Sequence, residues 1–100
     1  LIYWNLLAGG DGAIAATANA VPDLVMSIWN HFQAGNHDAA RNAQEALRPL
    51  RDAFAMGTMP VVLKTATQLL NLPVGPCRAP VQPLDAAAVQ KLETLLAVYR

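Results

Sequence analysis

One short apolar segment constrains this chain more than any other feature, because it is the only stretch whose pattern predicts a β-strand. Residues 11–21 are almost wholly apolar, mostly alanine, and turn residues bound them, as in a strand buried on both faces of a parallel sheet. A single strand leaves its backbone N–H and C=O groups unpaired. We therefore expect its partner strands to lie in missing sequence or in another chain, which would make this chain a fragment of a larger fold.

The segments on either side of this predicted strand have helical patterns. Residues 1–10 have the pattern of the last turns of an amphipathic helix that ends at two glycines. Pro22 suits a first helical position. Apolar residues then recur at three- and four-residue spacing over 24–32, until Gly35 ends the helix.

The second half of the chain predicts further helices separated by prolines. Asn36 is expected to cap a helix that Pro49 should kink or split. Another helix is predicted over 61–72. Four prolines within 73–83 exclude regular structure and impose an extended crossing, after which Asp85 is expected to cap the last helix.

Helical spacing also sorts the side chains of these segments into faces. A solvated ladder of charges is expected at Arg41, Glu45, Arg48 and Asp52. Core positions are expected for Trp29, Phe32 and Phe54.

Composition limits the classes of protein to which the chain can belong. It is 54% hydrophobic and 14% charged, whereas an average domain carries about 25% charged residues, so we expect it to pack against other protein. The net charge is zero and the basic residues are scattered, which argues against nucleic-acid binding. The apolar runs are shorter than the roughly 20 residues of a membrane span. The lone Cys77 fits a reducing compartment, and a cytoplasmic location is expected.

Five short motifs run along nearly the whole chain: GGDGAIAATAN at 9–19, GNHDAA at 35–40, LRPL at 47–50, PVVLK at 60–64 and CRAPVQPL at 77–84. In order and spacing they resemble the C-terminal third of the dihydrodipicolinate synthase and N-acetylneuraminate lyase family. No single motif is specific, but five in this order and at these spacings make a strong match.

The resemblance implies an α/β fold, a (β/α)8 TIM barrel followed by a C-terminal helical extension. Residues 1–34 would hold the end of barrel helix 7, strand 8 (about 12–18) and helix 8. Residues 35–100 would form the extension, so that the segment itself is mostly α-helical and one incomplete domain. A complete barrel runs to about 250 residues.

The family resemblance also implies a chemistry, that of class I aldolases. Such a lyase or synthase joins or cleaves a pyruvate or 2-keto acid unit through an imine on a lysine, which acts as an electron sink. That lysine and a proton-shuttling tyrosine would lie on strands upstream of Leu1. We therefore expect no catalytic residue in this chain and no activity from it alone. The implied partners are the remainder of the barrel and further subunits of a homotetramer, with no metal or organic cofactor.

Two residues of the predicted strand are expected to line the substrate pocket. The resemblance implies that Ile14 packs near the pyruvate moiety. Position 16 is alanine, where sialic-acid-cleaving relatives have serine, and the missing hydroxyl argues against a sialic acid lyase. Synthase, sugar-acid aldolase or dehydratase, and aryl-pyruvate chemistries stay open.

Other candidate sites have simpler structural explanations. Lys64 could serve as the nucleophile if apolar neighbours favoured its neutral amine, but a surface lysine with its stem along apolar residues is the commoner case. His31 and His37 lack a third metal ligand nearby. Cys77 has no paired cysteine and is expected to be a half-buried structural thiol. The glycines of 9–12 precede the strand, which is the wrong order for a phosphate loop.

A rival hypothesis from another class is a small helical interaction module without enzymatic activity. Its surplus of apolar residues would then form a partner-binding face. This hypothesis leaves the predicted strand without partners.

Overall fold

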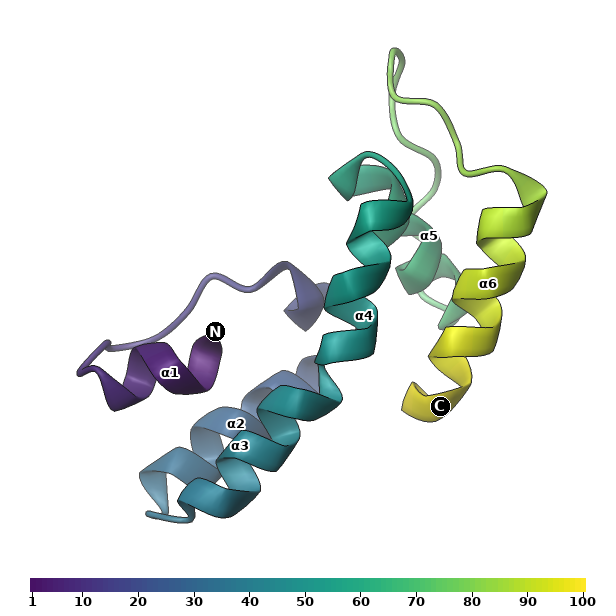
Figure 1. Cartoon of the computed structure of the whole chain (residues 1–100). Helices are drawn as coiled ribbons and strands as arrows, with labels where there is room; N and C mark the ends of the chain where they lie inside the picture. Colours follow the sequence, from purple (N-terminus) through teal and green to yellow (C-terminus); the bar gives the residue numbers. More distant parts are fainter. The chain divides into compact units, whose positions relative to one another are not determined.

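A computed structural model describes all residues of the chain, 1–100. The chain is mostly helical (Figure 1), with the elements α1 (Ile2–Leu7), η1 (Ala16–Asn19), α2 (Pro22–Gln33), α3 (His37–Ala46), α4 (Arg48–Ala53), η2 (Phe54–Met56), α5 (Met59–Leu69), α6 (Ala86–Leu96) and η3 (Ala97–Tyr99). The η elements are single 3-10 turns. The chain divides into two compact units, Leu1–Arg48 and Pro49–Arg100, which are described separately.

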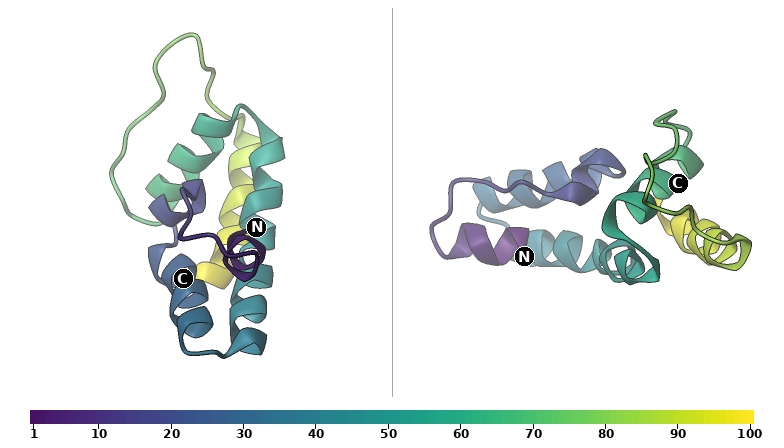
Figure 2. Two further views of the ribbon diagram at one scale, coloured as in Figure 1. Left: turned by 90° about the vertical axis from the view of Figure 1, so that its left-hand side faces the viewer. Right: turned by 90° about the horizontal axis from the view of Figure 1, so that it is seen from above.

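The first unit is built from α1, α2 and α3, and the latter two lie side by side (Figures 1 and 2). Ile28 of α2 and Ala40 of α3 are fully buried. Tyr3 and Leu6, one helical turn apart, turn the same face of α1 into the unit. The side-chain oxygen of buried Gln44 accepts a hydrogen bond from the Tyr3 backbone N–H at 2.9 Å, which satisfies a donor that the first turn of α1 leaves open.

The second unit centres on α5 and α6, which pack through Val62, Ala66, Leu92 and Leu96, all with no exposed surface. Between these helices runs a proline-rich segment, residues 72–84, which we call the strap. It forms a long loop without helix or strand (Figure 2). The sequence predicted an irregular crossing here, and the structure confirms it.

Most predicted helix signals are confirmed. Asn36 Oδ1 accepts from the Ala39 N–H at 3.1 Å and Asp85 Oδ1 accepts from the Ala88 N–H at 2.8 Å, so both residues cap helices. The chain divides at Leu47 into α3 and α4, two residues before Pro49, which cannot donate a helical hydrogen bond to the carbonyl of Glu45.

The helix predicted over 61–72 has different ends in the structure. It begins at Met59 because Pro60 is compatible with a first turn. It ends at Leu69 because Asn71 takes a left-handed backbone, φ 69°, as asparagine can. The predicted core residues Trp29, Phe32 and Phe54 are only half-buried.

The predicted strand is absent from the structure. Residues 10–15 have no regular secondary structure, and Ala16–Asn19 forms the 3-10 turn η1. Ala15 does have an extended backbone, with φ −106° and ψ 117°. A strand exists only where a neighbour takes its hydrogen bonds, and this chain contains no β-strand that could do so. The assignment of residues 12–18 to barrel strand 8, with helix 8 and the extension after it, stays a prediction.

Candidate functional site

The candidate site is the segment between α1 and α2, because it carries both predicted pocket residues. Ile14 lies on its irregular part with a relative exposure of 107%, so nothing in the chain covers it. Ala16 begins η1 and is half-buried. The two residues therefore lie on one segment, but no closed pocket surrounds Ile14.

Asn5 fixes the start of this segment. Its Nδ2 donates to the Gly12 carbonyl at 2.7 Å, and its own carbonyl accepts from the Gly10 N–H at 2.9 Å. A Cβ at Gly10 would lie 2.5 Å from the Asn5 amide, so only glycine fits without moving that side chain. Gly10 and Gly12 are therefore parts of a turn that Asn5 holds. This is consistent with the expectation that the glycines of 9–12 do not form a phosphate loop.

Thr17 fixes the other end of the segment. It is buried, and its carbonyl accepts from the N–H groups of Ala20 at 3.1 Å and Val21 at 2.9 Å. The Asn19 side chain donates to the Ala16 carbonyl at 3.1 Å. The segment is thus held at both ends, and its exposed apolar middle can serve as a wall for a ligand or for a neighbouring strand.

No nucleophile or general base lies within residues 12–16, whose side chains are all apolar or absent. Both lysines lie in the other unit. Lys64 Nζ donates to the Pro76 carbonyl at 3.0 Å, and Lys91 is exposed on α6. The contact of Lys64 holds the strap to α5, which gives this lysine a structural role.

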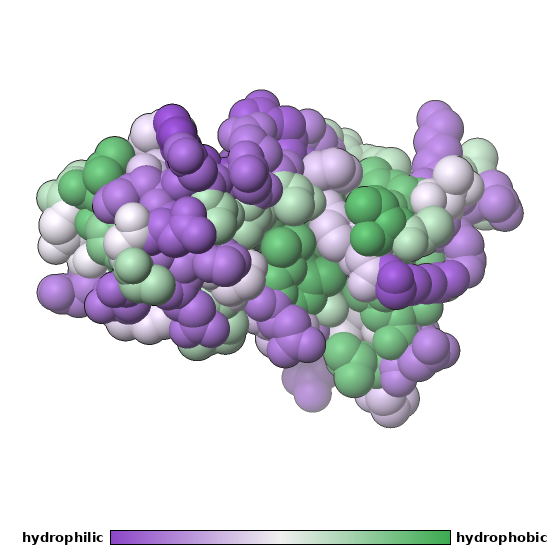
Figure 3. Space-filling view, turned by 90° about the horizontal axis from the view of Figure 1, so that it is seen from below, coloured by the Kyte–Doolittle hydropathy of each residue, from purple (hydrophilic) through white to green (hydrophobic).

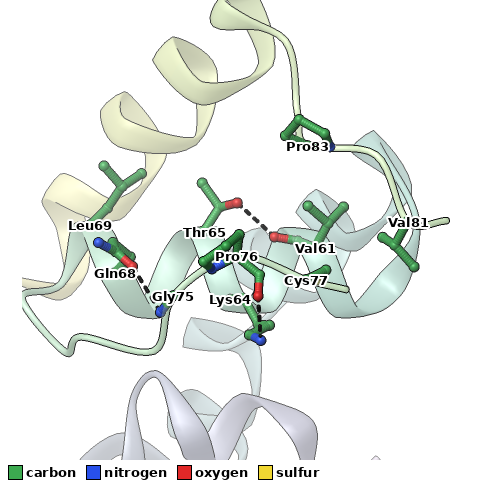
Figure 4. Close-up of a pocket in the computed structure, with 10 residues that line it drawn as sticks. All are labelled: Val61, Lys64, Thr65, Gln68, Leu69, Gly75, Pro76, Cys77, Val81 and Pro83. Atoms are coloured by element: carbon green, nitrogen blue, oxygen red, sulfur yellow. Dashed lines mark hydrogen bonds between the residues drawn. The ribbon is translucent and has the colours of Figure 1, made fainter. Parts of the chain in front are cut away.

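The histidines, the cysteine and the acidic residues form no cluster of three or more that could hold a metal. His37 Nδ1 lies 3.2 Å from the Tyr3 hydroxyl, and their rings meet edge to face. Cys77 is half-buried and lines a cavity between α5 and the strap (Figure 4). Nothing in the sequence pattern predicted this cavity.

Charged side chains pair on the surface of α3 and at its end. Arg41 pairs with Asp38, and Arg48 pairs with Glu45 at 2.9 Å. The hydrogen bonds from Arg48 hold the pKa of the exposed Glu45 carboxyl below its usual value. Two members of the predicted ladder, Glu45 and Arg48, therefore do interact.

Hydrophobic side chains also reach the surface between hydrophilic ones (Figure 3). Leu1, Trp4 and Leu7 recur every three residues along α1 and are 71%, 49% and 51% exposed. The buried Tyr3 and Leu6 lie on the neighbouring face, so the apolar surface of α1 extends beyond the face that it buries. None of the helices has the length and apolarity needed to span a bilayer.

Comparison with known proteins places these observations in a family. Residues 2–98 match the dihydrodipicolinate synthetase family. The chain is 35% identical over 91 residues to the 4-hydroxy-tetrahydrodipicolinate synthase of Archaeoglobus fulgidus. It is 36% identical over 91 residues to that of Methanococcus aeolicus. Each alignment covers 91% of this chain and 32% of the relative, so the chain spans about a third of the length of the curated relatives it matches.

Comparison with solved structures leads to the same family. The chain superposes on a monomeric dihydrodipicolinate synthase variant with a TM-score of 0.89 and 29% identity, over 97% of this chain and 32% of that one. YagE, a prophage protein of the dihydrodipicolinic acid synthase family from E. coli K12 in complex with pyruvate, gives 0.87 and 30%, over 96% and 33%. Sequence and fold therefore lead to one conclusion: this chain belongs to the dihydrodipicolinate synthetase family.

Proposed function

We propose that this chain is the C-terminal part of a Schiff-base-forming lyase or synthase that acts on pyruvate or a 2-keto acid. The carrying observation is the superposition on a dihydrodipicolinate synthase over 97% of this chain but 32% of that protein. The pyruvate complex of YagE supports pyruvate as the substrate class. The whole enzyme is a cytoplasmic homotetramer in this proposal.

In this proposal the chain contributes pocket wall, and the remainder of the barrel contributes the catalytic lysine. The segment 11–15 supports this division of roles, because both of its ends are anchored and no strand of this chain pairs with its extended backbone. Barrel strands on either side would take those hydrogen bonds. Ile14 would then face the pyruvate unit instead of water, and Ala16 would leave no hydroxyl for a polyhydroxylated acid.

The exposed face of α1 also supports a larger assembly. Leu1, Trp4 and Leu7 expose apolar surface that is best explained by burial against further protein. The same residues are compatible with a non-enzymatic helical interaction module, which is the alternative function.

Borohydride trapping with pyruvate, read by intact mass, tests the proposal. The longer protein that contains these residues should gain one reduced pyruvate adduct, and the 100-residue chain should gain none. An adduct on the 100-residue chain would contradict the proposal, and Lys64→Met and Lys91→Met would then identify the nucleophile. A chain that exists only at this length, forms no adduct and melts cooperatively alone would favour the interaction module.

A further inference from the structure

The second unit contains a cavity of about 380 Å³ between α5 and the strap. Small-molecule pockets typically measure about 300–1,000 Å³. The α5 helix forms one side and strap residues 75–83 the other (Figure 4). The lining is mostly apolar, and its residues include Val61, Leu69, Val81 and Pro83.

Two side chains of α5 hold the strap across this cavity. Lys64 Nζ donates to the Pro76 carbonyl at 3.0 Å, and one helical turn later Gln68 Oε1 accepts from the Gly75 N–H at 3.3 Å. The prolines of the strap restrict its backbone, which opposes collapse onto α5. The cavity is therefore bounded by residues with defined contacts.

Two side chains at the cavity, those of Lys64 and Gln68, keep N–H groups that their contacts with the strap do not use. An ammonium has three N–H groups, and the Lys64 contact with Pro76 uses one of them. Gln68 uses its oxygen on Gly75, which leaves its NH2 group. The Thr65 hydroxyl already donates to the Val61 carbonyl at 2.7 Å. No aspartate or glutamate lines the cavity, so its one formal charge is positive.

We propose that this cavity binds a small monocarboxylate with an unbranched apolar body, such as a medium-chain fatty acid. The carboxylate would accept charge-assisted hydrogen bonds from Lys64, and the apolar body would displace water from the walls. The site is independent of the proposed lyase function. All of its residues lie in Pro49–Arg100, and pyruvate has no apolar body to fill it.

Binding at the cavity can be followed through the reactivity of the Cys77 thiol, because Cys77 is the only cysteine of the chain and it lines the cavity. We expect octanoate to slow the reaction of this thiol with a disulfide reagent saturably, by fivefold or more at saturation. Octylammonium and octanol at the same concentrations should slow it less than twofold, and pyruvate not at all. No protection by octanoate, or equal protection by the ammonium or the alcohol, would overturn the proposal.

A pair of variants tests the role of Lys64. Lys64→Gln removes the charge while keeping an N–H donor for the strap, and it should raise the Kd for octanoate at least fivefold. Lys91→Gln removes a charge of the same sign from the exposed face of α6, outside the cavity, and should leave the Kd unchanged. An unchanged Kd in Lys64→Gln would refute the assignment. If that variant fails to fold by circular dichroism, the comparison of the three octyl compounds on the unmodified chain decides alone.

Discussion

At the scale of single residues, the contacts around the candidate segment are tight and specific. Asn5 reaches over Gly10 to the Gly12 carbonyl, so one amide determines where the segment leaves α1. At the other end of the chain, Arg100 donates to the Leu69 carbonyl at 2.7 Å and pairs with Glu93 at 3.1 Å. These side chains stabilise backbone that has no regular hydrogen bonding of its own.

The contact between Gly10 and Asn5 can be tested by a double-mutant cycle. Gly10→Ala should force the Asn5 amide away from the Gly12 carbonyl and lower the free energy of unfolding by about 1 kcal/mol. Asn5→Ala should have a similar effect. The double variant should lose little more than either single one, because the clash and the hydrogen bond share one side chain. Urea unfolding of the four chains measures this, and additive losses would contradict the contact.

A second prediction concerns Tyr99 and the dependence of stability on pH. Burial raises the pKa of this phenol above its usual value of 10.0, although the Leu50 N–H that donates to it at 3.2 Å acts in the opposite direction. The folded state therefore binds the proton more tightly than the unfolded state. The contribution of Tyr99 to the free energy of unfolding is therefore fully present below about pH 10, and it is lost as the pH rises through the pKa of the folded state. Tyr99→Phe should make the alkaline decline in the free energy of unfolding less steep, as urea melts at about pH 9 and 11 would show.

At the scale of elements, the same kinds of local hydrogen bond begin and end several helices. Three helices end in the paired hydrogen bonds of a Schellman motif, in which Gly9, Gly35 and Asn71 supply the left-handed residue. Pro49 lies in the first turn of α4, next to the break at Leu47, and Asn36 and Asp85 cap α3 and α6. These boundaries depend on hydrogen bonds between residues at most five positions apart. They were therefore predictable from the sequence, except at Asn71, because asparagine takes a left-handed backbone less often than glycine does.

The cap of α6 is the element most easily tested. Asp85→Ala removes the acceptor of the Ala88 N–H and should lower the free energy of unfolding by about 1 kcal/mol. Asp85→Asn keeps a side-chain oxygen at the same place and should lose less than half of that. Equal losses in the two variants, measured by thermal or urea unfolding, would mean that the negative charge and not the hydrogen bond stabilises the helix.

At the scale of the whole molecule, several large apolar side chains are exposed because neither unit buries them. Ile14 is fully exposed, and Leu1, Trp4 and Leu7 are about half exposed or more. The chain belongs to the dihydrodipicolinate synthetase family and spans about a third of its relatives' length. In the proposed barrel, the remaining two thirds would bury this apolar surface. The same residues should therefore behave differently alone and in the longer protein.

Ile14→Ser separates these two situations. In the 100-residue chain the side chain is fully exposed, so the change in the free energy of unfolding should stay within about 0.5 kcal/mol. In the longer protein we expect kcat/KM for pyruvate to fall about tenfold, because an apolar contact with the substrate is lost. Val98→Ser, at an exposed position of η3, is the matched control and should change neither quantity. Unchanged kinetics in Ile14→Ser would remove Ile14 from the proposed pocket.

The helices, their caps, the break near Pro49 and the irregular strap were predictable from the sequence alone, and so was the family resemblance, which the comparisons confirm. All but the last depend on backbone conformation and hydrogen bonds within a few residues. Three features became apparent only from the folded chain: residues 12–18 form no strand, Trp29 and Phe32 are half-buried, and α5 and the strap line an open cavity. A strand, a buried side chain and a cavity wall each require partners distant in sequence. A local pattern does not specify which distant residues those partners are.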